Sequence, residues 1–220
     1  MFRRLIYPGY ARLTSASRKA SRRTSERGGF IRTGAVFSAV IGIDTNLTLA
    51  YQLFALLLCM IILSRIALRY QKPQVSLRRR LPRYATVGEL FDYQISIANL
   101  GDQIEKDLRI VDNPRVITPD YEQFRREREP FEETRTAYDR WIGFHRFMWL
   151  QRRSTGISVK QANVPEIHRR GTVEARIEAN PLRRGIVYFS STSLLHPDPL
   201  GLNYGILPFP NPESLIILPR

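Results

Sequence analysis

An apolar segment near the N-terminus constrains this chain more than any other feature. Residues 47–68 carry almost only apolar side chains, and as a helix they would extend about 33 Å at about 1.5 Å per residue. The hydrocarbon core of a bilayer is about 30 Å thick. We therefore expect this segment to span a membrane, with Arg65 and Arg69 reaching back to the interface.

A shorter apolar segment, residues 30–43, precedes it, and the polar residues 44–46 separate the two. The first segment contains Arg32 and would extend only about 24 Å even from Gly28. Basic residues flank the pair on both sides, and basic flanks stay on the cytoplasmic face of a membrane. An even number of crossings is then required. We expect a transmembrane hairpin over residues 30–68; a re-entrant first segment is the alternative.

The net charge of +14 suggests nucleic-acid binding until its distribution is considered. Residues 1–29 hold eight Arg or Lys and one acid, and residues 65–83 hold seven Arg or Lys and no acid. The rest of the chain is balanced, so the distal domain lacks the basic face that phosphate binding needs. Basic clusters beside a membrane segment attract anionic headgroups by about 1 kcal/mol per residue. We therefore expect a lipid bilayer, and no nucleic acid, as a partner.

The basic leader, residues 1–29, leaves two alternatives. Its Arg- and Ser-rich composition resembles an organelle transit peptide, and it equally suits a basic cytoplasmic tail. A cleaved secretory signal is disfavoured because the charged region is long and no small-residue cleavage site follows it. Cys59 is the only cysteine and lies within the apolar segment, so we expect it to face lipid or a helix.

A β pattern follows a basic linker, which we expect over residues 69–83. Residues 91–100 and 172–179 alternate apolar and polar side chains, which is typical of half-buried strands. Turns rich in Pro and Gly separate six or seven such short strands. The pattern predicts a mainly β fold, an immunoglobulin-like β-sandwich over residues 84–220.

A helical insertion within the sandwich is predicted at about residues 119–153. Its second half places aromatic and apolar side chains at the spacing of one helix face, at Tyr138, Trp141, Ile142, His145, Met148 and Trp149. Phe144, Phe147 and Leu150 lie off this stripe, and Gly143 weakens the helix by about 1 kcal/mol. The stripe either packs as core or meets a protein partner or the bilayer interface. The candidate interface residues are Tyr138, Trp141, Phe144, Met148 and Trp149.

The sequence contains no motif that indicates catalysis. It has no Gly-rich phosphate loop, no Gly-x-Ser-x-Gly elbow and no His-Glu-x-x-His helix. His145, which we expect to be packed, lies far along the chain from His168 and His196. Asp112 and Asp198 both occur in turn sequences, where capping of the turn explains a carboxylate. We therefore expect no catalytic, cofactor-binding or metal-binding residues.

Several short motifs occur in an order that resembles one known family. They are Arg80-Leu81-Pro82, Gly88 before a strand that ends at Asn99, Asp112, Tyr138-Asp139-Arg140-Trp141, Arg183-Arg184-Gly185 and Asp198-Pro199-Leu200-Gly201-Leu202. Together with the preceding pair of apolar segments, they resemble the N-terminal half of the bacterial membrane proteins called DUF58. The resemblance covers nearly the whole chain after residue 30.

The resemblance implies a cytoplasmic β-sandwich beside a two-helix anchor in the bacterial inner membrane. In the family, a domain similar to von Willebrand factor A usually follows, and the genes often accompany MoxR-type AAA+ ATPases, which implies an adaptor or chaperone-like role. Here the sequence ends at Arg220, where that second domain would begin. Either the chain is a fragment, or the anchor and the sandwich act alone. The family-motif turn residues are Arg183, Arg184, Gly185, Asp198, Pro199 and Gly201.

The first functional hypothesis is a membrane-anchored, non-enzymatic scaffold that presents the sandwich to a protein partner, an AAA+ ATPase by the resemblance. One alternative is an interfacial lipid-binding module that uses the helix over residues 141–149. The other is a membrane enzyme whose site uses the turns around residues 183–198. Nothing in the sequence predicts the oligomeric state.

Overall fold

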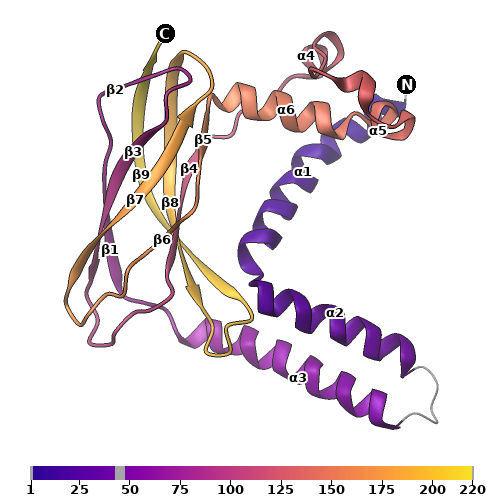
Figure 1. The fold of residues 1–220 in the computed structure, drawn as a ribbon, viewed down its shortest axis with the longest axis vertical. Coiled ribbons are helices and arrows are strands. Elements are labelled where there is room, and N and C mark those ends of the chain that lie inside the picture. Colours follow the sequence, from indigo (N-terminus) through magenta and orange to yellow (C-terminus); the bar gives the residue numbers. More distant parts are fainter. Residues whose placement is uncertain (1, 43–47, 220) are drawn as a thin grey trace.

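A β-sandwich with a group of helices at its side makes up the computed structural model, which describes residues 2–42 and 48–219 (Figure 1). The helices are α1 (Phe2–Arg23), α2 (Glu26–Ile41), α3 (Thr48–Tyr70), α4 (Tyr121–Arg126), the 3-10 turn η1 (Glu132–Thr134), α5 (Ala137–Ile142) and α6 (Phe144–Thr155). The strands are β1 (Val75–Arg80), β2 (Tyr84–Thr86), β3 (Phe91–Asn99), β4 (Arg109–Pro114), β5 (Ile157–Val159), β6 (Ala162–Asn163), β7 (Thr172–Pro181), β8 (Gly185–Pro197) and β9 (Tyr204–Leu218).

The strands form two sheets. One has the order β1-β3-β7-β5 and the other the order β2-β9-β8-β4-β6. Strand β2 runs parallel to β9, and every other named pair is antiparallel. The predicted immunoglobulin-like β-sandwich is therefore confirmed, and the helices between β4 and β5 form an insertion in it.

The core lies between the sheets, where alternate residues of each strand point inward. In β3 the inward residues are Tyr93, Ile95 and Ile97, all buried. Ile95 lies opposite Ala175 of β7, and Tyr93 lies opposite Ile177. The second sheet contributes Ile110, Val187, Phe189, Leu194, Leu215 and Ile217.

A buried ion pair links the two sheets within this core. Arg79 of β1 donates to the Asp112 carboxylate of β4, and also to Thr192 Oγ1 of β8 at 2.8 Å. Tyr93 Oη donates to the second Asp112 oxygen at 2.7 Å. The Arg79 guanidinium also lies 4.9 Å from the centre of the Phe189 ring. Burial and the neighbouring Asp112 charge raise the pKa of Tyr93, which therefore remains a donor at physiological pH.

This pair corrects two expectations. The range 69–83, expected to be a linker, contains the end of α3 and strand β1, and Asp112 lies inside β4 rather than in a turn. The inward positions of β1 are Val75, Leu77 and Arg79. An arginine at an inward position hides the alternation of apolar and polar residues by which a strand is recognised.

Most of the leader, residues 2–23, forms helix α1 and packs against the rest of the molecule. Tyr10 of α1 donates from its hydroxyl to the Ile142 carbonyl at 2.6 Å, and Arg18 donates to Gln151 Oε1 at 2.6 Å. Aromatic side chains of α1 pack on the helical arm, by which we mean α4, η1, α5 and α6; the residues concerned are Tyr7, Tyr10, Phe124, Phe147 and Leu150. Tyr7 and Tyr10 lie three residues apart on one face of α1, which is otherwise rich in Arg and Lys.

Helices α2 and α3 lie side by side and antiparallel, and extend away from the sandwich (Figure 1). Apolar side chains are exposed along both, including Phe30, Val36, Phe37, Val40, Leu49, Leu56, Leu58, Ile62 and Leu63, and so is Cys59. Among the described residues, Leu49–Tyr70 is the one helix long and apolar enough to cross a membrane, with a mean hydropathy of 2.1. The predicted polar turn, residues 44–46, lies outside the described residues, and the crossing by α2 stays a prediction.

Replacing Arg79 by Met should destabilise the protein by about 3–5 kcal/mol, because Asp112 would then be buried without its partner. In a chain of this size, that change lowers the melting temperature by about 10 °C. The measurement is thermal unfolding of the full chain in detergent. Arg78→Met, on the exposed side of the same strand, is the matched control and should change stability by less than about 0.5 kcal/mol. Equal melting temperatures for the two variants would contradict the assignment.

Candidate functional site

The turn between β8 and β9 lies where the hairpin of α2 and α3 meets the sandwich. Asp198 organises this turn: its Oδ1 accepts the Leu202 amide at 2.8 Å, and its Oδ2 accepts the Asn203 amide at 3.1 Å. Gly201 has φ +66, in the left-handed region that glycine adopts without strain. The predicted capping role of Asp198 is confirmed.

Helix α3 contributes Ser64 to the turn. The Ser64 hydroxyl donates to the Asp198 carboxylate and accepts from Asn203 Nδ2 at 2.5 Å. Ser64 and Asp198 are both buried. A hydroxyl and a carboxylate away from water are costly unless they are hydrogen-bonded, and each of these groups has its partner on the other element. The polar contact therefore holds α3 in one position against the sandwich.

Helix α2 begins on the same turn. Ser25 is its N-cap, and the Ser25 hydroxyl accepts the Gly28 amide at 2.9 Å and lies 2.6 Å from the Gly201 carbonyl. The Ser25 amide donates to the Leu202 carbonyl at 3.2 Å. A Cβ on Gly28 would lie 1.9 Å from that carbonyl oxygen. Only a glycine permits this approach of α2 to the turn.

Arg32 completes the contact. Its guanidinium donates to Thr24 Oγ1 and to Asn203 Oδ1, so Asn203 binds side chains from both helices of the hairpin. We call this set, Ser25, Gly28, Arg32, Ser64, Asp198 and Asn203, the junction. It consists of satisfied hydrogen bonds, which makes it suited to fixing an orientation.

His196 lies just before the junction, at the end of β8, and is buried. Its ring packs against Gly205 of β9, where a Cβ would lie 2.1 Å from Nε2. Burial lowers the pKa of His196; a hydrogen bond to Pro197 opposes this, and the charge of Lys72 adds to it. The histidine therefore favours its neutral form. Among the described residues, no group of three or more His, Cys, Asp or Glu side chains could hold a metal ion.

The prediction that the aromatic residues form one continuous helix face is wrong. Gly143 has φ +73 and ends α5, and α6 begins after it, so the helical period is interrupted. Tyr138 and Trp141, before the break, are 68% and 50% exposed. His145, expected to be packed, is exposed, whereas the core side of α6 is formed by residues expected off the stripe, Phe147 and Leu150. Phe144, Met148 and Trp149 are half-buried.

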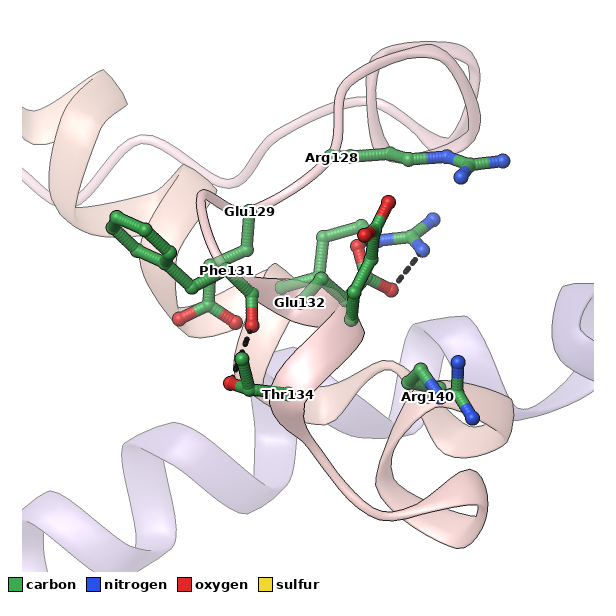
Figure 2. Close-up of a pocket in the computed structure, with 8 residues that line it drawn as sticks. Arg128, Glu129, Phe131, Glu132, Thr134 and Arg140 are labelled. Carbon is green, nitrogen blue, oxygen red and sulfur yellow. Dashed lines mark hydrogen bonds and ion pairs between the residues drawn. The ribbon is translucent and has the colours of Figure 1, made fainter.

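A pocket of about 560 Å³ opens in the helical arm, and Figure 2 shows the residues that line it. Arg146 Nε donates to Glu132 at 3.0 Å, and Arg135 Nη2 lies 2.8 Å from Glu129. Burial opposes the charge on Glu132, but the hydrogen bonds and the charge of Arg146 outweigh it and lower its pKa. The Glu132 carboxylate is thus held as an anion by Arg146, and Glu129 is paired with Arg135. Both pairs suit a structural role rather than proton transfer.

The family-motif turns lie at opposite ends of β8. Arg183 and Arg184 are exposed before it, and Gly185 begins it with φ +133. Asp198, Pro199 and Gly201 follow its other end. A strand of 13 residues is about 40 Å long. The two turns therefore do not form one site, and an active site built from both is contradicted.

Five residues of the junction were not predicted as site residues: Ser25, Gly28, Arg32, Ser64 and Asn203. One signal could have found Ser64, because a polar side chain within an apolar, membrane-length helix points to a specific partner. The partner itself lies over 130 positions away along the chain, where no local pattern reaches it.

Comparisons with known proteins do not identify the chain. No family model matches it, and no curated protein sequence does. Similar solved structures include the ASH/PapD-like domain of human CEP192 (15% identity, 68% of this chain and 91% of that chain, TM-score 0.32). Others are WR4, a C. elegans MSP family member (8%, 67% and 100%, TM-score 0.27), and a cohesin module from a Clostridium perfringens ATCC13124 family 33 glycoside hydrolase (9%, 68% and 100%, TM-score 0.29). TM-scores this low support no conclusion about function, and the membership of DUF58 stays a prediction.

Replacing Gly28 by Ala should separate α2 from the turn, because the new Cβ would meet the Leu202 carbonyl. We expect faster amide hydrogen exchange over residues 198–204, measured by mass spectrometry on the full chain. Gly29→Ala is the matched control, since a Cβ there meets nothing within 4 Å. Equal exchange in the two variants would show that the junction does not hold the hairpin.

Proposed function

We propose that this chain is a membrane-anchored, non-enzymatic scaffold that holds its β-sandwich at the cytoplasmic face of a bacterial inner membrane and presents it to a protein partner. The junction is the observation that carries this proposal. Buried hydrogen bonds from Ser64 and Ser25 to the turn that Asp198 organises give the sandwich one orientation relative to the hairpin. A flexible tether would not need them.

The exposed apolar surface of α2 and α3 supports the anchor. Monomeric soluble proteins rarely expose contiguous apolar patches of more than a few hundred Å², whereas both hairpin helices carry such side chains along their length. Arg27, Arg65 and Arg69 lie at the end of the hairpin nearest the sandwich. Basic residues there favour a cytoplasmic sandwich.

An apolar surface on the five-stranded sheet supports a protein partner. Ile216 of β9 lies opposite Tyr84 of β2 and Ile186 of β8, and all three are exposed. Tyr188 is exposed two residues further along. We call these four residues the outer apolar patch. It lies toward the start of β8, far from the junction, where a cytoplasmic partner could reach it. The resemblance to DUF58 makes a MoxR-type AAA+ ATPase the partner that we propose.

The position of the helical arm favours a second function, contact with the lipid interface. Figure 1 shows α1 running crosswise to the hairpin, with the arm at its far end. A bilayer crossed by the hairpin would therefore extend along α1 toward the arm. Tyr138 and Trp141 are exposed there, and Tyr and Trp favour the membrane interface.

The anchor is tested by extraction and by labelling. The full chain should stay with the membrane pellet after alkaline carbonate treatment. In a Cys59→Ala background, Thr45→Cys should react with an impermeant maleimide added outside spheroplasts, and Leu100→Cys should react only after lysis. Release by carbonate would contradict the anchor, and labelling of Leu100→Cys from outside would contradict the cytoplasmic sandwich.

The partner surface is tested by binding of a purified MoxR-type ATPase to the full chain in detergent. Ile186→Glu should weaken binding about tenfold or more, because a carboxylate would enter an apolar contact. Trp141→Glu, the matched change on the arm, should leave ATPase binding unaltered. Loss of binding in Trp141→Glu alone would move the partner surface to the arm, and no binding by the unaltered chain would overturn the ATPase as partner.

A further inference from the structure

A basic cavity of about 650 Å³ lies where α1, α2 and α3 meet the start of β9. Five cationic side chains line it: Lys19 and Arg23 from α1, Arg32 from α2, and Arg65 and Arg69 from α3. Its lining includes no acidic residue. Three helices that are separate in the sequence thus direct positive charge to one place beside the junction.

The five cations have no acidic partner among the described residues. Within the part of the chain that the structure describes, none of them lies within 4.0 Å of a carboxylate, although other arginines and lysines form such ion pairs. Lys19 and Arg23 are four residues apart on one helix, and so are Arg65 and Arg69. Like charges at this spacing repel each other. A bound anion would remove that repulsion, which nothing in the cavity lining does.

The cavity also borders the apolar surface of the hairpin. Leu68 lines it. Leu63 and Ile66, which lie five and two residues before Leu68 on the same helix, are exposed. A ligand seated here would have its anionic part among the cations, and an apolar part could extend along α3. Acidic phospholipids have this combination, and basic pockets between helices on the cytoplasmic side of a membrane bind their headgroups.

We propose that the basic cavity binds the phosphate of an acidic glycerophospholipid, with its acyl chains along the hairpin. This proposal rests on the proposed membrane anchor and adds a specific lipid site to it. Arg32 is held in place by Thr24 and Asn203, so the bound phosphate would join α1 and α3 to the junction. The lipid would thereby stabilise the orientation of the sandwich that the scaffold function requires.

The probe is phosphatidylglycerol, added to the full chain in neutral detergent. Native mass spectrometry then gives the number of lipid molecules bound to each protein molecule. We expect one tightly retained lipid, with phosphatidylcholine not retained. Arg65→Gln with Arg69→Gln should weaken retention about 30-fold, since each arginine contributes about 1 kcal/mol to headgroup attraction. Arg183→Gln with Arg184→Gln removes the same charge from exposed positions at the far end of the sandwich and should retain the lipid as the unaltered chain does.

A second arm separates the lipid from free phosphate as the source of the anion. Inorganic phosphate and glycerol phosphate at millimolar concentration should neither displace the lipid nor raise the melting temperature as phosphatidylglycerol does. Displacement by either would assign the cavity to a soluble phosphate and overturn the lipid proposal. Equal retention by the two double variants would also overturn it, because it would indicate diffuse attraction by net charge.

The same preparation distinguishes failure of this proposal from failure of the anchor. If the chain resists carbonate extraction but both double variants retain lipid equally, the anchor is supported and the lipid site is contradicted. Release of the chain by carbonate would contradict the anchor, and it would also overturn the lipid site, because that site depends on the anchor. Retention that depends on Arg65 and Arg69, in a chain that resists extraction, supports both.

Discussion

The carboxylate of Asp198 is the group on which the arrangement of the molecule depends. One oxygen accepts the Leu202 amide, and the other accepts the Asn203 amide and is the acceptor for Ser64 of α3. A buried carboxylate that lost these donors would carry a large desolvation cost. The same group therefore shapes the β8–β9 turn and fixes the hairpin on it. Arg32, through Asn203, brings α2 into the same network.

The two buried carboxylates of the sandwich act at different levels. Asp112, with Arg79 and Tyr93, joins one sheet to the other inside the core, whereas Asp198 joins the sandwich to the helices outside it. Both are fully hydrogen-bonded, which is the condition under which a buried charge specifies one geometry rather than destabilising the fold. The basic cavity differs from both, because its cations face one another without acids. That contrast is why we assign an external anion to the cavity and none to the core.

Prediction from the sequence succeeded where the pattern is local. The alternation in β3 identified a strand with Tyr93, Ile95 and Ile97 inward, and the apolar composition of α3 identified a membrane-length helix. It failed at Arg79, which was assigned to a linker because its partner Asp112 is 33 positions away. It also failed at the aromatic stripe, because the prediction assumed one continuous helix, whereas the left-handed backbone at Gly143 separates α5 from α6.

The sequence by itself determined the elements of this protein: an apolar pair of segments with all excess positive charge at its flanks, and short alternating strands that form a sandwich. Those features follow from periods of two and 3.6 residues and from composition, which are local properties. Only the tertiary structure decided how the elements meet. The close approach at Gly28, the Ser64–Asp198 bond and the convergence of Lys19, Arg32 and Arg65 join residues far apart in the chain, and the packing of whole elements, rather than any local preference, brings them together.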